Sequence, residues 1–201
     1  MTFNINDFKN QLTYGGARPS LFQVQLSLPA NLSDPVNNGI GDATGSSNPE
    51  VERKVAFLCR ATSIPASTVS AIDVPYFGRK TKVAGNRTFA PWSITVMNDE
   101  DFLIRKAMEK WLAAINGHAS NIKNSGVTSR PADYQATAIV RQFSKGPEEL
   151  AIRAYKFVNL FPTEVSTIEL DWNTTDAIEE FQVTFEYDYW EIDTSSDLGV
   201  L

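Results

Sequence analysis

The residue types that most often carry out chemistry are few in this chain and lie far apart. His118 is the single histidine and Cys59 the single cysteine, so the spacing of a His/Cys metal site and an intramolecular disulfide are both excluded. Ser120 and Ser125 follow His118 in a loop, but no nucleophile-elbow sequence surrounds either serine. We therefore expect no metal, no cofactor and no Ser-His-Asp chemistry.

Carboxylates occur in pairs that could in principle act as an acid and a base. The pairs are Glu148–Glu149, Glu179–Glu180, and Asp171 with Asp176. Neighbouring residues on a strand point to opposite faces, so Glu179 and Glu180 cannot work together there. No glycine-rich loop that could hold a phosphate is present. The sequence predicts a protein that is not an enzyme.

A run of cations is the other chemically distinctive feature. Arg79, Lys80 and Lys82 are followed by Arg87, in a chain with 24 acidic and 18 basic residues and a net charge of −6. Nucleic-acid binding needs a broad basic surface, which this acidic chain lacks. The cluster is interpreted as a hairpin face that is either solvated or part of an interface.

Composition favours one globular domain over residues 1–201. A hydrophobic fraction of 42% with 12 Phe, 6 Tyr and 4 Trp can fill a core without disulfides. The single cysteine fits assembly in a reducing compartment. No signal peptide is visible, and no apolar run approaches the roughly 20 residues that cross a bilayer. We expect synthesis in the cytoplasm and no stable membrane insertion.

Most of the chain alternates apolar and polar residues with the period of two that strands require. Strands are expected over 20–28, 54–61, 69–77, 79–84, 92–97, 135–144, 150–160, 167–170 and 178–190. A turn at Gly85-Asn86 is expected to lead into Thr88-Phe89. In the last strand the carboxylates Glu180, Glu186 and Asp188 share one face, opposite an apolar row.

One helix is expected after Asn98, which could cap it. An apolar stripe follows and indicates packing against the sheet: Ile104, Met108, Trp111, Leu112 and Ile115. We assign Trp92, Met108, Trp111 and Phe185 to the core. The fold class expected is mainly β (α+β), a β-sandwich or barrel with one packed helix.

Three segments depart from this pattern. Residues 1–16 are expected to form an N-terminal arm with a short helix over 6–14, capped by Asn6 or Asp7. Residues 29–50 are rich in Pro, Asn, Asp, Gly and Ser, which predicts an inserted flexible loop. The polar residues 191–201 are expected to form a frayed C-terminal tail.

Seven short phrases, in order along the chain, resemble the tail tube proteins of T4-like contractile phages (myophages). The phrases are Ala17-Arg18-Pro19-x-Leu21-Phe22-Gln23-Val24; Phe57-x-Cys59-x-Ala61-Thr62-x-x-Pro65-Ala66; Arg79-Lys80-x-x-Val83-Ala84-Gly85-x-Arg87-Thr88-Phe89; Trp92-x-x-Thr95-Val96-Met97-Asn98-Asp99-Glu100; Ala138-Ile139-Val140-Arg141-Gln142; Leu170-Asp171-Trp172; and Asp188-Tyr189-Trp190-Glu191. The chain departs from the family mainly at residues 29–50, where the T4-like pattern has a short hairpin turn.

The resemblance implies a structural virion protein of the inner tail tube, assembled in the host cytoplasm. It implies hexameric rings whose subunits contribute strands to an inter-subunit β-barrel, stacked into a conduit for DNA ejection. The implied partners are other copies of the chain, the tail sheath protein, baseplate tube proteins, the tape-measure protein, the tail terminator, and phage DNA in transit without specific binding. A tube protein of a phage-like contractile injection or secretion system, or a baseplate or tube-capping homologue, remains open.

Two surfaces are expected to serve this assembly. The 79–89 hairpin is expected to contact another subunit or a stacked ring, through Arg79, Lys80, Lys82, Asn86, Arg87 and Phe89. The acidic face of the last strand, with Glu180, Glu186 and Asp188, is expected to line the lumen or to face solvent. Six copies of a chain with net charge −6 carry about −36, which would keep DNA phosphates from adhering to the wall.

Overall fold

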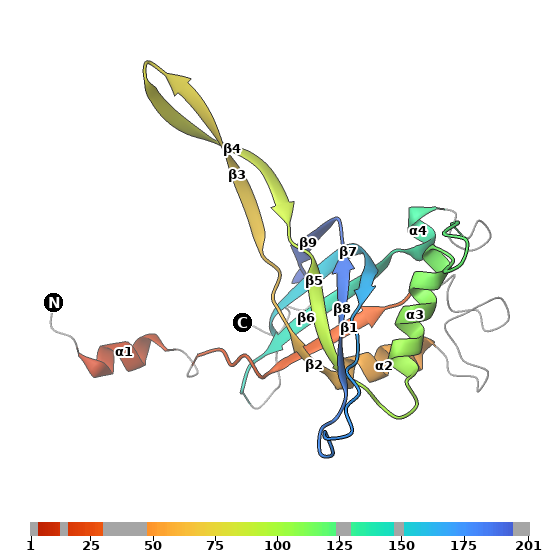
Figure 1. Cartoon of the computed structure of the whole chain (residues 1–201). Coiled ribbons are helices and arrows are strands. Elements are labelled where there is room, and N and C mark those ends of the chain that lie inside the picture. Colours follow the sequence, from red (N-terminus) through yellow and green to blue (C-terminus); the bar gives the residue numbers. More distant parts are fainter. Residues whose placement is uncertain (1–3, 13–15, 30–47, 124–129, 147–150, 195–201) are drawn as a thin grey trace.

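The computed structural model of the chain describes residues 4–12, 16–29, 48–123, 130–146 and 151–194 (Figure 1). Most of the expected 29–50 loop, and the end of the expected 191–201 tail, lie outside the described residues. No helix among the described residues is long and apolar enough to cross a membrane.

A sheet of seven strands forms the body of the protein. Its path is β1 (Phe22–Ser27), β6 (Ala136–Phe143), β7 (Ala151–Val165), β8 (Glu180–Glu186), β5 (Trp92–Met97) and β2 (Cys59–Thr62), and β9 (Tyr189–Ile192) pairs with β7. The strands β3 (Ser67–Tyr76) and β4 (Arg79–Phe89) form a separate two-stranded sheet that projects from the body (Figure 1).

The long strand β7 connects two halves of the body sheet. Its first part pairs with β6 and β9, whereas Phe161 to Val165 pair with β8. Trp92 on β5 stacks on Phe157 of β7 with ring centroids 4.3 Å apart, although β5 and β7 are not paired strands. The two halves therefore face each other across one apolar core. The expected mainly β fold is confirmed.

Two helices cover this core. α3 (Leu103–Ile115) packs on β7 and buries Ile104, Met108 and Trp111, as the apolar stripe predicts. α2 (Asn48–Leu58) packs on β1 and α3. Two shorter helices, α1 (Ile5–Gln11) and α4 (Pro131–Tyr134), bury none of their side chains.

The strand expected over 54–61 is wrong for residues 54–58 and confirmed for residues 59–61. Residues 48–58 are helical, and the strand β2 begins only at Cys59. Val51 and Val55 are fully buried one helical turn apart, while Phe57 is 74% exposed. The four-residue spacing of the buried valines therefore fixes the helix, and the alternation of Val55, Phe57 and Cys59 is incidental.

The expected helix caps are also wrong. Asn4 caps α1, because its Oδ1 accepts a hydrogen bond from the backbone N–H of Asn6 at 3.0 Å. Asn98 continues the end of β5: its N–H donates to the carbonyl of Glu179 at 2.8 Å. At the start of α3 the carboxylate of Asp101 accepts from the N–H of Leu103 at 2.9 Å.

Three strand boundaries differ from expectation. β4 runs unbroken through Gly85 and Asn86, where the register against β3 shifts in a bulge. The turn expected at Gly78, between the strands expected over 69–77 and 79–84, is confirmed: Phe77 and Gly78 have φ angles of 43° and 77°, which fit a two-residue hairpin turn. The strand expected over 178–190 divides into β8 and β9, and no strand forms over 167–170.

Candidate assembly interface

The β3–β4 hairpin is held by its own ladder. The strands pair from Ser67 with Phe89 to Tyr76 with Arg79, and within the described residues neither strand pairs with any other. Both outer edges therefore present free N–H and C=O groups, which other chains can pair with. An isolated two-stranded hairpin is marginally stable in water, so its stability depends on what covers it.

The bulge in β4 explains why glycine stands at position 85. A Cβ atom there would lie 2.4 Å from the side-chain oxygen of Ser70, which is closer than packing permits. The same hydroxyl of Ser70 donates to the carbonyl of Asn86 at 3.2 Å. The close approach of β3 to β4 at the bulge therefore favours glycine at position 85.

Five of the six residues expected at the interface are exposed on this hairpin. They are Arg79, Lys80, Lys82, Asn86 and Arg87. Phe89 lies at the base, half-buried, with its ring 6.0 Å from that of Tyr187 and 6.3 Å from that of Trp190. Phe89 thus joins the hairpin to the body, and the other five residues point away from the body's core.

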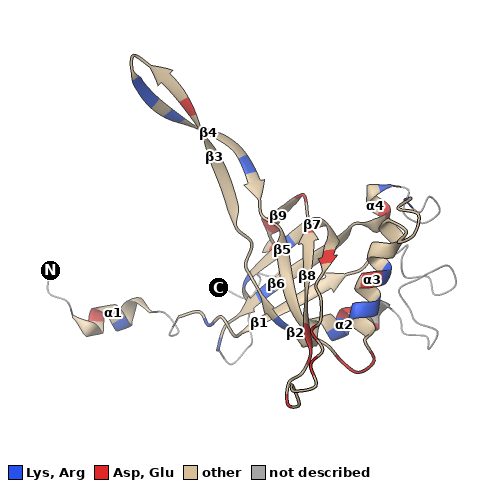
Figure 2. Ribbon diagram, viewed as in Figure 1, with Lys and Arg blue, Asp and Glu red and all other residues tan. Residues whose placement is uncertain are grey.

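The cations of the hairpin are nearly all free of ion pairs within the part of the chain that is described. Lys80 lies 3.5 Å from the carboxylate of Asp73, a long and exposed contact. Arg79, Lys82 and Arg87 make no ion pair with a described residue. Figure 2 shows Lys and Arg residues at the outer end of the hairpin, well away from the body, and a further one on the inner half of β4. Their charges are available to another chain.

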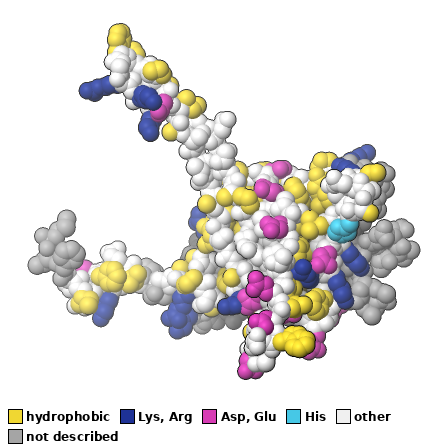
Figure 3. All heavy atoms as spheres, viewed as in Figure 1, with side chains coloured by type: hydrophobic (Ala, Val, Ile, Leu, Met, Phe, Trp, Pro, Cys, Tyr) yellow, Lys and Arg dark blue, Asp and Glu magenta, His cyan; other side chains and the backbone are white. Residues whose placement is uncertain are grey.

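The hairpin also exposes large apolar side chains, which the sequence pattern did not identify as a surface. Phe77 at the turn is 91% exposed, and Tyr76 beside it 69%. The other members of this apolar surface are Val69, Ile72, Val74 and Val83. Figure 3 shows apolar and basic side chains together on the projection. Such a combination is typical of a protein–protein contact.

The outer face of β8 is polar, as its alternation predicts. Glu180, Gln182, Thr184 and Glu186 alternate with the buried Phe181, Val183 and Phe185. On this face Gln182 lies opposite Thr95, and Thr184 opposite Ser93 of β5. Glu180 forms an ion pair with Arg60 of β2. The face carries hydroxyls and amides with carboxylates near both ends.

Asp188 does not share this face. It lies between β8 and β9, and its Oδ2 accepts a hydrogen bond from Nδ2 of Asn159 at 2.6 Å. Of the three carboxylates that the sequence groups together, the structure therefore keeps Glu180 and Glu186 on one strand face and places Asp188 against Asn159 of β7.

Four large residues that the sequence assigns to the core are buried, and they hold these surfaces in place. Trp92, Met108, Trp111 and Phe185 are at most 1% exposed. The indole N–H of Trp92 donates to Oγ1 of Thr62 at 3.0 Å, and that of Trp111 donates to the carbonyl of Tyr134 at 2.9 Å. Their polar atoms are satisfied, so these rings fix the sheet and helix rigidly.

The few groups with nucleophilic or ligating chemistry are scattered. Burial raises the pKa of Cys59 to about 12, so its thiol stays protonated at neutral pH. His118 is exposed after α3. Among the described residues, no group of three or more His, Cys, Asp or Glu could hold a metal ion.

Comparison with known proteins gives the chain a clear set of relatives. The model of a family described as phage tail tube protein matches residues 17–193. The chain is 34% identical over 175 residues to the tail tube protein gp19 of Enterobacteria phage T4, covering 87% of this chain and 91% of that protein. It is 23% identical over 185 residues to the tail tube protein of Serratia phage KSP90, covering 91% and 93%.

Solved structures share the fold at low identity. A chain of the sheath–tube complex of an extracellular contractile injection system superposes with a TM-score of 0.54 at 13% identity, covering 92% of this chain and 96% of that one. A chain of the anti-feeding prophage baseplate gives 0.55 at 10% identity, covering 88% and 95%. These matches concern the arrangement of strands and helices.

Proposed function

This chain belongs to the phage tail tube protein family and is a tail tube protein of a contractile phage, and we propose that it assembles through its β3–β4 hairpin into stacked hexameric rings. Its place is in the virion, and its relatives are structural proteins. We propose accordingly that its work is done by surfaces and strand edges, without catalysis.

The observation that carries the proposal is the fully projecting hairpin. Each residue of β3 is exposed, as is each residue of β4 except Gly85 and Phe89, and among the described residues the only ion pair of the hairpin's cations is that of Lys80 with Asp73. A partner that covers the hairpin would bury its valines and aromatic rings and pair its cations with carboxylates. Because all copies are identical, the same surface of a neighbouring copy can cover the hairpin of every subunit in a ring.

We propose further that the subunits of a ring join their strands into one β-barrel, and unpaired strand edges support this. β1 and β2 end the path of the body sheet, and both edges of the hairpin are unpaired among the described residues. Joining such edges between subunits would close the wall and remove sites for uncontrolled pairing.

The polar outer face of β5 and β8 is proposed to line the lumen. β5 and β8, which the structure describes in full, contain no Lys or Arg, and the neighbouring Arg60 of β2 is neutralised by Glu180. DNA could then pass without being held. The tail sheath, baseplate tube proteins, tail terminator and tape-measure protein are proposed as the further partners. The fold's occurrence in a sheath–tube complex and in a baseplate supports the first two.

Electron microscopy of purified protein tests this function. We expect rings or hollow tubes from the unchanged chain, and their loss in the variant Arg79→Glu/Lys80→Glu. The control Lys9→Glu/Arg53→Glu makes the same change in charge at exposed positions on α1 and α2. Normal tubes from the hairpin variant would contradict the proposed role of its cations.

A further inference from the structure

The loop between β7 and β8 exposes apolar side chains on a part of the body remote from the hairpin. In this acidic loop, defined as residues 166–179, Trp172 is 98% exposed, Leu170 81% and Ile178 68%. Tryptophan is rarely left so open on a monomer's surface, and it is enriched among the residues that dominate binding at interfaces. The loop therefore has the composition of a contact surface.

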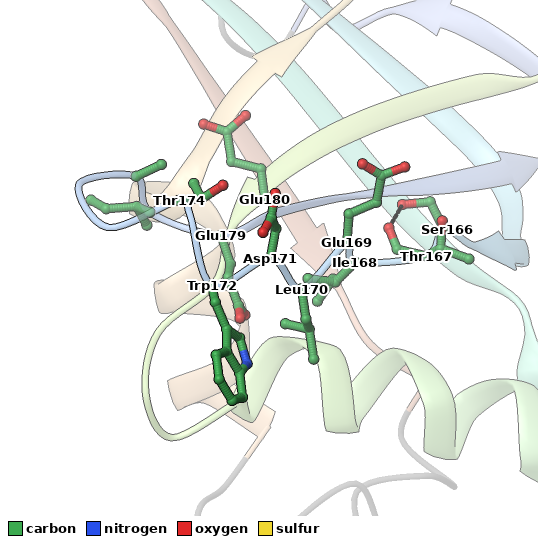
Figure 4. Close-up of a pocket in the computed structure, with 12 residues that line it drawn as sticks. Ser166, Thr167, Ile168, Glu169, Leu170, Asp171, Trp172, Thr174, Glu179 and Glu180 are labelled. Carbon is green, nitrogen blue, oxygen red and sulfur yellow. Dashed lines mark hydrogen bonds between the residues drawn. The ribbon is translucent and has the colours of Figure 1, made fainter.

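Carboxylates surround these apolar groups. Residues 166–180 contain five acidic residues and no basic one. Four of them, Glu169, Asp171, Glu179 and Glu180, line an open depression of about 730 Å³ together with Leu170, Trp172 and Ile178. In Figure 4, Leu170 and Trp172 project to one side of the loop, and Glu169 and Glu180 to the other.

The stem of the loop is held in place by several hydrogen bonds. The N–H of Ser166 donates to the carbonyl of Gln182 at 2.8 Å, and the N–H of Gln182 donates to Oγ of Ser166 at 2.8 Å. Arg105 of α3 donates to the carbonyl of Ser166 at 3.1 Å. At the tip, Asp171 accepts from the backbone N–H of Asn173 at 3.0 Å. These hydrogen bonds therefore hold the stem and the tip of the acidic loop in place within the single subunit.

The tip of the hairpin has the complementary composition. Tyr76 and Phe77 stack edge to face with ring centroids 4.7 Å apart, next to the cations Arg79, Lys80 and Lys82. The tip thus joins exposed aromatic rings to positive charge, and the acidic loop joins an exposed indole to negative charge. Aromatic pairs and charge-assisted hydrogen bonds reinforce one another when water is excluded from both.

We propose that the acidic loop of one subunit receives the hairpin tip of a neighbouring copy, an inference that rests on the proposed function. The hairpin and the loop extend from opposite ends of the body, so they cannot meet within one chain (Figure 1). A contact between two different patches of identical subunits is heterologous, and such contacts propagate assemblies head to tail. The carboxylates of the loop pair with the cations of the tip, and Phe77 packs against Leu170 and Trp172.

Cross-linking tests this pairing directly. Thr81 on β4 and Thr175 in the loop are exposed, and neither is among the proposed contact residues. We would place cysteines at both positions in a Cys59→Ser background and treat assembled protein with a short bismaleimide. The pairing predicts a ladder of covalent multimers on a denaturing gel. Each single-cysteine control should lack the ladder.

Charge reversal gives a second readout. Glu169→Lys/Asp171→Lys is expected to abolish tubes, and adding Lys80→Glu/Lys82→Glu in the same chain is expected to restore them. The control Asp7→Lys/Glu100→Lys makes an equal change at exposed positions elsewhere and should leave tubes intact.

The outcomes separate this inference from the proposed function. If the Cys59→Ser parent forms tubes but the double-cysteine protein gives no ladder, the pairing is overturned and the tube function stands. A link from Thr175→Cys to added sheath protein in place of the ladder would likewise overturn the pairing, because it would identify another partner for the loop. If the parent forms neither rings nor tubes, the proposed assembly itself fails.

Discussion

Nδ2 of Asn159 donates to Oδ2 of Asp188 at 2.6 Å, across the point where β7 passes from one half of the body sheet to the other. Asn159 has a φ of 58°, in the left-handed region, and the N–H of Asp188 donates to the carbonyl of Val158 at 3.1 Å. The bend of β7 and the break between β8 and β9 are therefore one feature, fastened by two hydrogen bonds.

Two substitutions at Asn159 should separate the free energy of the left-handed backbone conformation from the stabilisation by the hydrogen bond to Asp188. A valine there is strained at positive φ by about 1–3 kcal/mol and also loses the bond to Asp188. Asn159→Gly accepts the φ angle and should lose about 1 kcal/mol, mostly from the missing bond. Urea unfolding of dispersed protein measures both. Equal losses in the two variants would show that the conformation is not strained.

The same substitution at Trp92 and at Trp172 tests which of the two tryptophans stabilises the folded subunit. Trp92→Phe removes two hydrogen bonds of the indole N–H and part of a stack on Phe157, and should lower the free energy of unfolding by about 1–3 kcal/mol. Trp172→Phe, at a 98% exposed position, should change it by less than about 0.5 kcal/mol. A large loss from Trp172→Phe would place that ring in the fold rather than on its surface.

The link between α2 and the start of α3 should depend on pH. Lys54 forms ion pairs with Asp101 and, at 2.9 Å, with Asp99. The hydrogen bond from Lys54 lowers the pKa of Asp101 below 3.8, and the bond to Asp101 raises the pKa of Lys54 above 10.5. Lys54→Met should therefore cost about 0.5–1 kcal/mol near neutral pH, since the pairs are partly exposed.

The sign of the effect follows from the two shifts. The contribution of Asp101 is present above its unfolded pKa and is lost as the pH falls through its lowered folded pKa. The contribution of Lys54 is lost as the pH rises through its raised folded pKa. The deficit of Lys54→Met should therefore be constant between about pH 5 and pH 9 and vanish at both extremes. Lys9→Met on α1 is the control, and a deficit that persists at pH 2 would refute the assignment.

The sequence predicts strands well where burial alternates over many residues. β8 has Phe181, Val183 and Phe185 on one face, and no other periodicity competes with it. Residues 51–59 carry two patterns at once, because the spacing of Val51 and Val55 fits a helix while the alternation of Val55, Phe57 and Cys59 fits a strand. The choice is made by tertiary contacts such as the bond from the N–H of Leu28 to Oε1 of Glu52 at 2.8 Å, which local patterns cannot supply.

Of the two candidate surfaces, the sequence likewise predicts one and not the other. The cations of the hairpin are adjacent in sequence, so their clustering is visible without coordinates. The acidic loop is not visible as a surface in the sequence, because large apolar residues such as Leu170 and Trp172 are usually buried and only the fold shows that they are exposed. The sequence predicts the wrong face for Asp188 for a related reason: the alternation continues past Glu186, whereas Asn159, the residue that binds Asp188 beyond the end of β8, lies in another strand.

Chemical labelling should decide which face of the sheet lines the passage. Gln182 is exposed on the polar face of β8, and Ala119 is exposed after α3, on the side of the helices. A cysteine at either position, in a Cys59→Ser background, should react with a small maleimide in subunits and in tubes. If the β8 face lines the lumen, tube assembly should block a maleimide carried on a large polymer at Gln182→Cys only, because the polymer cannot enter the lumen. Equal labelling of both positions by the polymer in intact tubes would place the β8 face outside and remove the polar lumen from the proposed function.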